Sequence, residues 1–186
     1  MSSRMGEDKL IMEYRGETFL RRLLDLSLKL PVYERILVTT KPRKEHPRIA
    51  SILSDFCVIE NDAPELGQSE SIRLGIEAAS GTHFFFFPAD QPLLTLNDIE
   101  PYFDAAKAHN DKIIFPVIDN KPSSPTLFPA RFRTELLELS GDKGGSRVRN
   151  ANMDSCHTFS PITPGHFTDI DSVEDLGFTL GGMVIK

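Results

Sequence analysis

Hydrophobic residues along the chain fall into two kinds of pattern, one typical of helices and one typical of strands. In the stretch 19–28 they recur every three or four residues and Pro31 follows, so we predict an amphipathic helix that packs on a sheet. Continuous apolar runs are typical of buried strands, and they occur at 35–40, 56–59, 82–87 and 112–117. Further helical patterns separate these runs, at 46–54, at 69–80, after Thr95 and at 131–139. Thr95-x-x-Asp98 resembles a capping box that starts the third of these helices.

The run at 82–87 contains four consecutive phenylalanines, Phe84 to Phe87. Because hydrophobic residues in this run do not alternate with polar ones, both faces of the strand should be buried, as in the middle of a parallel sheet covered by helices. An aromatic platform for a ligand is the alternative interpretation. A buried core is the more common role of such residues.

Strands that alternate with helices at this spacing predict an α/β fold, a three-layer α/β/α sandwich with a mostly parallel, Rossmann-like sheet. We find no internal repeat, low-complexity segment or linker, so residues 1–186 are expected to form a single domain. In open sheets of this kind ligands bind beyond the carboxyl ends of the strands. Residues that directly follow the predicted strands are therefore the first candidates for a functional site.

Composition narrows the range of partners. Of the 186 residues 40% are hydrophobic, no apolar run approaches twenty residues, and the net charge is −6. These values disfavour a membrane span and a duplex nucleic acid partner, since nucleic acid binding depends on neutralising phosphates. The cysteines, Cys57 and Cys156, form no C-x-x-C motif and follow no signal peptide, so we expect a cytoplasmic protein, and Cys156-His157 is interpreted as structural.

Two glycine-containing stretches are suited to binding a nucleotide. Ser3, Arg4, Gly6 and Lys9 combine small residues with two cations, which suits a triphosphate, although a frayed N-terminus is the alternative. In the second stretch, which runs from Gly67 to Gly75, Ser69 is predicted to cap a helix. The amide of Gln68, just before it, can read a base edge or a ribose hydroxyl, although an ordinary loop and cap explain both residues equally well.

Two carboxylates are candidates for holding a divalent cation. Asp90 directly follows the phenylalanine strand, where a carboxylate is well placed to hold Mg²⁺ bound to phosphates, and a turn-forming Asp before Pro92 is the alternative. Asp171 lies in Asp169-Ile170-Asp171-Ser172, where capping of a helix explains it as well as a second metal ligand does. The residues leave both interpretations of Asp171 open.

Taken in order, these stretches resemble the molybdenum cofactor cytidylyltransferases, a family with a MobA-like NTP transferase domain and a nucleotide-diphospho-sugar transferase-like fold. The chain shows Ser-Arg-Met-Gly with Lys-Leu, Gly-Gln-Ser-x-Ser, Asp-Gln-Pro, Gly-Asp-Lys-Gly and Asp-Ile-Asp in the family's order. These matches lie at 3–10, 67–75, 90–92, 141–144 and 169–176.

The resemblance implies a role for each candidate residue. Arg4 and Lys9 would bind the triphosphate, Gln68 and Ser69 would contact the nucleotide, and Asp90 and Asp171 would hold Mg²⁺. The implied reaction is attack by the phosphate of molybdopterin on the α-phosphorus of CTP, which releases pyrophosphate. A phosphate nucleophile is already anionic, so no general base is needed.

The Gly141–Gly145 loop looks like the family's acceptor-side element, where Lys143 or Arg147 would meet the pterin phosphate. A loop that ends a helix explains its glycines equally well. A molybdoenzyme or its maturation chaperone is the protein partner that the resemblance implies.

The sequence departs from the family's pattern at three places. Met1 falls inside the signature Leu-Ala-Ala-Gly-x-Ser-x-Arg-Met-Gly, so the first strand and its turn are missing, which would leave the neighbouring strands unpaired. Ser124 replaces the histidine of the family's Gly-His-Pro, which puts the acceptor in doubt, and Ser172-Val173 replaces Thr-Pro. Two alternatives therefore stand beside the cytidylyltransferase: a guanylyltransferase or other NTP transferase with a different acceptor, and a non-catalytic nucleotide-binding module.

Overall fold

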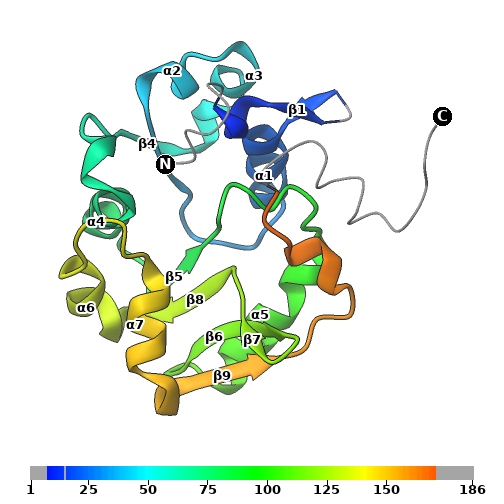
Figure 1. Cartoon of the computed structure of the whole chain (residues 1–186), viewed down its shortest axis with the longest axis vertical. Helices are drawn as coiled ribbons and strands as arrows, with labels where there is room; N and C mark the ends of the chain where they lie inside the picture. Colours follow the sequence, from blue (N-terminus) through cyan, green and yellow to red (C-terminus); the bar gives the residue numbers. More distant parts are fainter. Residues whose placement is uncertain (1–7, 15, 171–186) are drawn as a thin grey trace.

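The computed structural model describes residues 8–14 and 16–170 (Figure 1). The strands are β1 (Glu13–Tyr14), β2 (Glu17–Thr18), β3 (Ile36–Thr39), β4 (Cys57–Glu60), β5 (His83–Phe86), β6 (Ile113–Ile118), β7 (Lys121–Pro122), β8 (Thr126–Pro129) and β9 (Cys156–Phe159). The helices are α1 (Phe19–Leu28), α2 (Lys41–Lys44), α3 (Pro47–Ala50), α4 (Gln68–Ala78), α5 (Leu96–Ala108), α6 (Arg133–Leu137) and α7 (Gly145–Ala151), with short 3₁₀ turns between them.

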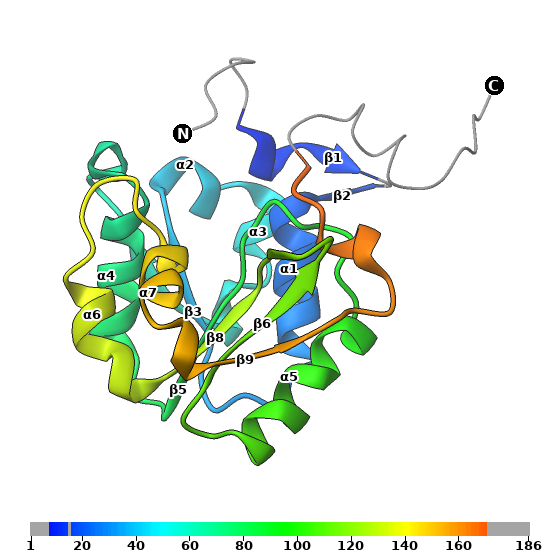
Figure 2. The same cartoon turned by 60° about the horizontal axis from the view of Figure 1, so that its bottom comes forward.

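Helices cover both faces of the sheets, which confirms the predicted α/β sandwich. The larger sheet has the order β5-β8-β6-β7, and β9 also pairs with β6 (Figure 2). Within it β8 runs antiparallel to both β5 and β6, whereas β9 is parallel to β6. This sheet is therefore mixed, where the sequence predicts a mostly parallel one. The smaller sheet pairs β3 with β4 in parallel.

Local signals in the sequence explain where helices α1 and α5 begin. Thr18 caps α1, because its Oγ1 accepts the N–H of Arg21 at 3.2 Å. At the start of α5, Thr95 and Asp98 form the reciprocal capping box that the sequence predicts. The apolar residues of α1 face inward, as expected from their spacing, and all of Phe19, Leu20, Leu23, Leu24 and Leu26 are buried.

The phenylalanine strand divides its side chains between the two faces. Phe84 and Phe86 pack with Ile76 of α4, in a core that also contains residues of α6 and α7. Phe85 and Phe87 pack on the opposite side, where the ring of Phe85 lies 4.6 Å from that of Tyr102 in α5. Both faces of β5 are covered, as predicted, and the phenylalanines pack in the core. The predicted position in the middle of a parallel sheet is wrong, because β5 is an end strand of the described sheet and pairs antiparallel with β8.

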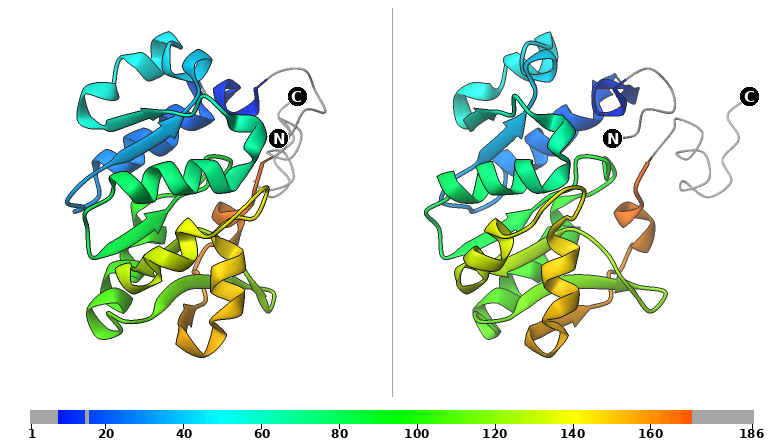
Figure 3. Two further views of the ribbon diagram at one scale, coloured as in Figure 1. Left: turned by 90° about the vertical axis from the view of Figure 1, so that its left-hand side faces the viewer. Right: turned by 60° about the vertical axis from the view of Figure 1, so that its left-hand side comes forward.

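Strands β3 and β5 belong to different sheets but are held close to each other. Glu34, just before β3, accepts the backbone N–H groups of Ser80 and Gly81, just before β5, at 2.7 and 2.9 Å. Helix α4 crosses both strands, since Gly75 lies against Val38 and Ile76 packs on Phe84 (Figure 3). Within the part of the chain that the structure describes, β3 pairs only with β4 and β5 only with β8. Each strand therefore has one edge without a partner strand there.

An added strand should stabilise this arrangement. We expect that a chain extended ahead of Met1 by a short apolar strand ending in Leu-Ala-Ala-Gly will unfold at higher urea concentration. The gain should be roughly 3 kcal/mol or more, since each new ladder hydrogen bond contributes about 1 kcal/mol net. The control extension has the same length with prolines at alternate positions, which cannot donate to a ladder. Equal midpoints for both extensions and the original chain would contradict the interpretation.

Candidate functional site

An ion pair joins the N-terminal stretch to the end of β5. Lys9 lies in a 3₁₀ turn (Lys9–Ile11), and its Nζ donates to Asp90 Oδ2 at 2.9 Å. The two side chains retain 17% and 26% of their exposure, so the pair is shielded but within reach of a ligand. The structure thus brings together two of the predicted site residues that lie 81 positions apart in the sequence.

Arg43 is a further cation beside this turn, and the sequence analysis did not identify it. Asp8 caps the turn that contains Lys9, because its Oδ1 accepts the N–H of Leu10 at 3.2 Å. Arg43, in α2, binds both carboxylate oxygens of Asp8 with its Nε and Nη2 atoms. This two-point contact fixes the start of the described chain on the carboxyl side of β3. Nothing in the local pattern around Arg43 indicates a partner so far away in the sequence.

Two glycine motifs that are distant in the sequence lie against each other. Gly67 has φ of +91°, and a Cβ atom there would lie 2.6 Å from the backbone of Gly141. The N–H of Ser69 donates to the carbonyl of Gly141 at 3.1 Å. The side chain of Gln68 packs on Gly144, where a Cβ atom would lie 2.3 Å from its Oε1. The predicted nucleotide-binding and acceptor-binding stretches therefore form one continuous surface.

One detail of the prediction at this surface is wrong. Helix α4 begins at Gln68 and its N-cap is Gly67, so Ser69 is a residue of the first turn and does not cap the helix. Gly67 adopts a backbone conformation that favours glycine, and the cap lies two residues earlier than the Ser69 pattern indicates. Ser69 is also buried, with 6% of its surface exposed, whereas Gln68 is exposed.

The start of α7 brings the glycine loop to the end of β5. A Cβ atom on Gly145 would lie 3.2 Å from the ring of Phe86, the last residue of β5 and four positions before Asp90. Lys143, in the loop, and Arg147, in α7, are both exposed. Neither forms an ion pair with any residue in 8–14 or 16–170, so both cations are available on this surface.

Four of the predicted site residues, Ser3, Arg4, Gly6 and Asp171, lie outside the described residues. The described chain nevertheless reaches the residue before Asp171. The N–H of Ile170 donates to the carbonyl of Asp90 at 2.8 Å, and the Ile170 side chain is fully buried beside Phe19.

The carboxylate of Glu70 at the start of α4 is paired with Arg73. Arg73 donates to both carboxylate oxygens of Glu70, at 2.9 and 2.6 Å, and this contact lowers the pKa of Glu70. The same hydrogen bonds, with one to Glu77, raise the pKa of Arg73. Glu70 therefore remains ionised, but its charge is paired and repels an anion at the α4 N-terminus less than an isolated carboxylate would.

Asp90 is the one predicted metal ligand that lies among the described residues. No group of three or more His, Cys, Asp or Glu side chains gathers for a metal within 8–14 and 16–170. Mg²⁺ on a nucleotide needs only one or two carboxylates, because phosphate oxygens and water complete its shell. Asp90 provides one such carboxylate at the strand exit, and its donor chemistry fits a hard cation of this kind.

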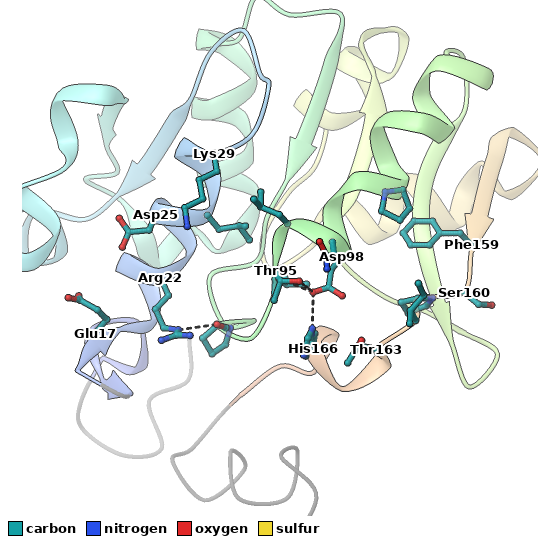
Figure 4. A pocket seen from close by; sticks show the side chains of 18 residues that line it. Glu17, Arg22, Asp25, Lys29, Thr95, Asp98, Phe159, Ser160, Thr163 and His166 are labelled. Carbon is teal, nitrogen blue, oxygen red and sulfur yellow. Dashed lines mark hydrogen bonds and ion pairs between the residues drawn. The ribbon is translucent and has the colours of Figure 1, made fainter.

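A cavity lies elsewhere on the molecule. It has a volume of about 710 Å³ and is bounded by α1, the loop that follows Asp90 and the segment after β9 (Figure 4). Its wall carries Arg22 and Lys29 but also Glu17 and Asp25. Of the described site residues Lys9, Gln68, Asp90 and Lys143, none lines it. Mixed charges do not suit a triphosphate, so we place the candidate site at the strand ends.

Solved structures of other proteins share this fold. Rv0371c from Mycobacterium tuberculosis is 21% identical, with 98% of this chain and 94% of that one covered and a TM-score of 0.75. A manganese complex of the same protein gives 19% identity, coverage of 94% and 92%, and a TM-score of 0.72. A nucleotidyl transferase from Methanothermobacter gives 20%, coverage of 90% and 81%, and a TM-score of 0.70.

Fold and sequence together define the class of this protein as a nucleotidyltransferase. The family model described as the MobA-like NTP transferase domain matches residues 1–156, and the chain belongs to this family. A relative from Methanosarcina acetivorans, named "Probable molybdenum cofactor guanylyltransferase", is 22% identical over 200 residues. That match covers 98% of this chain and 87% of the relative.

The contact between the two glycine motifs can be tested by adding a Cβ atom. We expect Gly67→Ala to lower the free energy of unfolding by about 2–3 kcal/mol, because the conformation is strained for alanine and the methyl group meets the Gly141 backbone. Gly16→Ala is the control, since Gly16 has a similar φ of +83° with no atom within 4 Å. Urea unfolding should show a smaller loss for the control, and equal losses would argue against close packing of the motifs.

Proposed function

We propose that this protein transfers CMP from CTP to the terminal phosphate of molybdopterin and releases pyrophosphate. The observation that carries the proposal is the Lys9–Asp90 ion pair at the exit of β5, close to the joined glycine motifs. A cation and a carboxylate side by side beyond the carboxyl end of a strand support the binding of a triphosphate and its metal there. We further propose that residues 157–186, beyond the family match, belong to the same domain, because Ile170 is bonded to Asp90.

The protein's own contribution to this reaction is positioning and charge. Lys9, together with Arg4, would bind the triphosphate and neutralise the charge that develops as pyrophosphate leaves. In the unliganded arrangement Asp90 holds Lys9, so phosphate oxygens would replace one partner of the pair. A divalent cation such as Mg²⁺, held by Asp90 and Asp171, would supply further neutralisation. The attacking phosphate is anionic, so no side chain has to remove a proton.

The remaining predicted residues divide between the two substrates. Gln68 is exposed at the start of α4, where its amide can contact the base or the ribose, and Ser69 lies beside it. Lys143 and Arg147 are exposed cations on the adjoining glycine loop and helix, where they would meet the phosphate of the acceptor. A molybdoenzyme or its maturation chaperone would receive the product. No described helix is long and apolar enough to cross a membrane.

Transfer of GMP from GTP is the second candidate function. It is favoured by the Methanosarcina relative, which is named as a guanylyltransferase. Both candidates use the same strand exit and the same acceptor, and they differ only in the base.

The nucleotide can be identified by measuring pyrophosphate release from the purified chain. Molybdopterin, Mg²⁺ or Mn²⁺, and either CTP or GTP are supplied in separate reactions. Release with CTP alone is the expected result, and release with GTP alone would assign the guanylyl reaction. Silence with both nucleotides, with nucleotide binding retained, would favour the non-catalytic binding module.

We expect Asp90→Asn to reduce metal-dependent pyrophosphate release at least about 100-fold, since the carboxylate that holds the cation is lost. Thermal unfolding should change little, because a partly exposed ion pair contributes about 1 kcal/mol or less. Asp104→Asn is the matched control: it removes a carboxylate that pairs with Lys107 on the exposed face of α5. If Asp90→Asn and the control were equally active, Asp90 would have no part in the reaction.

A further inference from the structure

Gln91, the residue after the candidate metal ligand Asp90, is buried and binds residues far away in the sequence. Gln91 retains only 2% of its exposure, although glutamine is usually a surface residue. Its Nε2 donates to the carbonyl of Phe167 at 2.8 Å and to Asp169 Oδ1 at 2.9 Å. One amide group thus binds two positions of a segment more than seventy residues further along the chain.

The same segment is held to the loop after β5 at other points. Ile170 donates its N–H to the carbonyl of Asp90, directly beside Gln91. His166 Nδ1 lies 2.8 Å from Asp98 Oδ2 (Figure 4). The Phe167 side chain is buried in the core with α5. The backbone from His166 to Ile170 is therefore held against the loop that begins with Asp90 and against the start of α5.

Burial of the Gln91 amide has an energetic cost that packing alone does not offset. Its Oε1 is buried and has no hydrogen-bond partner among the described residues. An unsatisfied buried acceptor costs about 1–3 kcal/mol, so an apolar residue of similar volume would serve the core at least as well. The Nε2 contacts, which hold the carboxylate and carbonyl of the following segment in register with Asp90, are what glutamine provides and leucine does not.

We propose that Gln91 is a positioning residue of the metal site, whose amide holds the segment Phe167–Ile170 against Asp90 and so fixes the place of Asp90 itself. This inference rests on the proposed function, in which Asp90 is a ligand of the divalent cation. Gln91 does not touch the cation or the substrates. It acts through the carbonyl of Phe167 and the carboxylate of Asp169, as outer partners do in metal sites.

The test measures binding of Mn²⁺ alone to the full chain, from the electron paramagnetic resonance signal of free Mn²⁺. Gln91→Leu should weaken Mn²⁺ binding about 10- to 100-fold, the loss typical of removing an outer partner of a metal ligand. Arg35→Met is the matched control for lost stability. Arg35 also donates to backbone carbonyls, those of Ser27, Leu28 and Leu30, but at the opposite end of β3. Its Mn²⁺ affinity should equal that of the original chain.

Asp90→Asn in the same series distinguishes the proposed metal site from the positioning role of Gln91. If the original chain and Asp90→Asn bind Mn²⁺ equally, the proposed metal site is wrong and the role of Gln91 falls with it. If Asp90→Asn loses Mn²⁺ while Gln91→Leu binds it as tightly as the original chain, only the positioning role is overturned. Should Gln91→Leu fail to fold, Asp169→Ala removes one end of the same contact from an exposed position. Weaker Mn²⁺ binding by Asp169→Ala supports the proposal, and unchanged binding overturns it.

Discussion

Asp90 and the backbone around it connect the parts of the molecule on which the candidate site depends. Lys9 binds its carboxylate, Ile170 binds its carbonyl, and the phenylalanine strand before it is anchored in the core on both faces. A partly exposed ion pair contributes about 1 kcal/mol or less by itself, which is small beside the entropy lost in ordering two distant segments. The buried side chain of Ile170 and the capped turn around Lys9 supply the remaining order. A ligand that bound Lys9 and Asp90 together would add to the same network.

Sequence patterns predicted those elements whose signals are local. The spacing of apolar residues located α1, and the Thr95–Asp98 box located the start of α5, because both depend on residues within one or two helical turns. They did not predict β8 or β9. Strand β8 is defined by its pairing with β5 and β6, and β9 by its pairing with β6, and all these partners lie outside any local window. The antiparallel direction of β8, which makes the sheet mixed, likewise depends on pairing partners and not on composition.

The candidate site, like the fold, was predicted where the signals are local and missed where they depend on distant contacts. The rule that ligands bind beyond strand ends selected Asp90, and the glycine motifs selected the stretches around Gln68 and Gly144, which the structure brings into contact. The roles of Arg43 and Gln91 were missed, because a polar residue in a sequence does not show whether it is buried or what it binds. The cap of α4 was misplaced since Gly67 carries no side chain to signal it.

The unpaired edges belong to β3 and β5, the strands whose carboxyl ends lead toward the candidate site. Strands β3 and β5 begin close together, because Glu34, before β3, is hydrogen-bonded to the residues before β5. Thr40 follows β3, and Phe87 follows β5 and leads to Asp90. Any strand that ran between β3 and β5 in the same direction would end beside the turn that holds Lys9. Its ladder hydrogen bonds would fix β3 to β5, and its last residues would lead toward the Lys9–Asp90 pair. Such a strand would therefore stabilise the sheet and at the same time hold its own carboxyl end close to the Lys9–Asp90 pair.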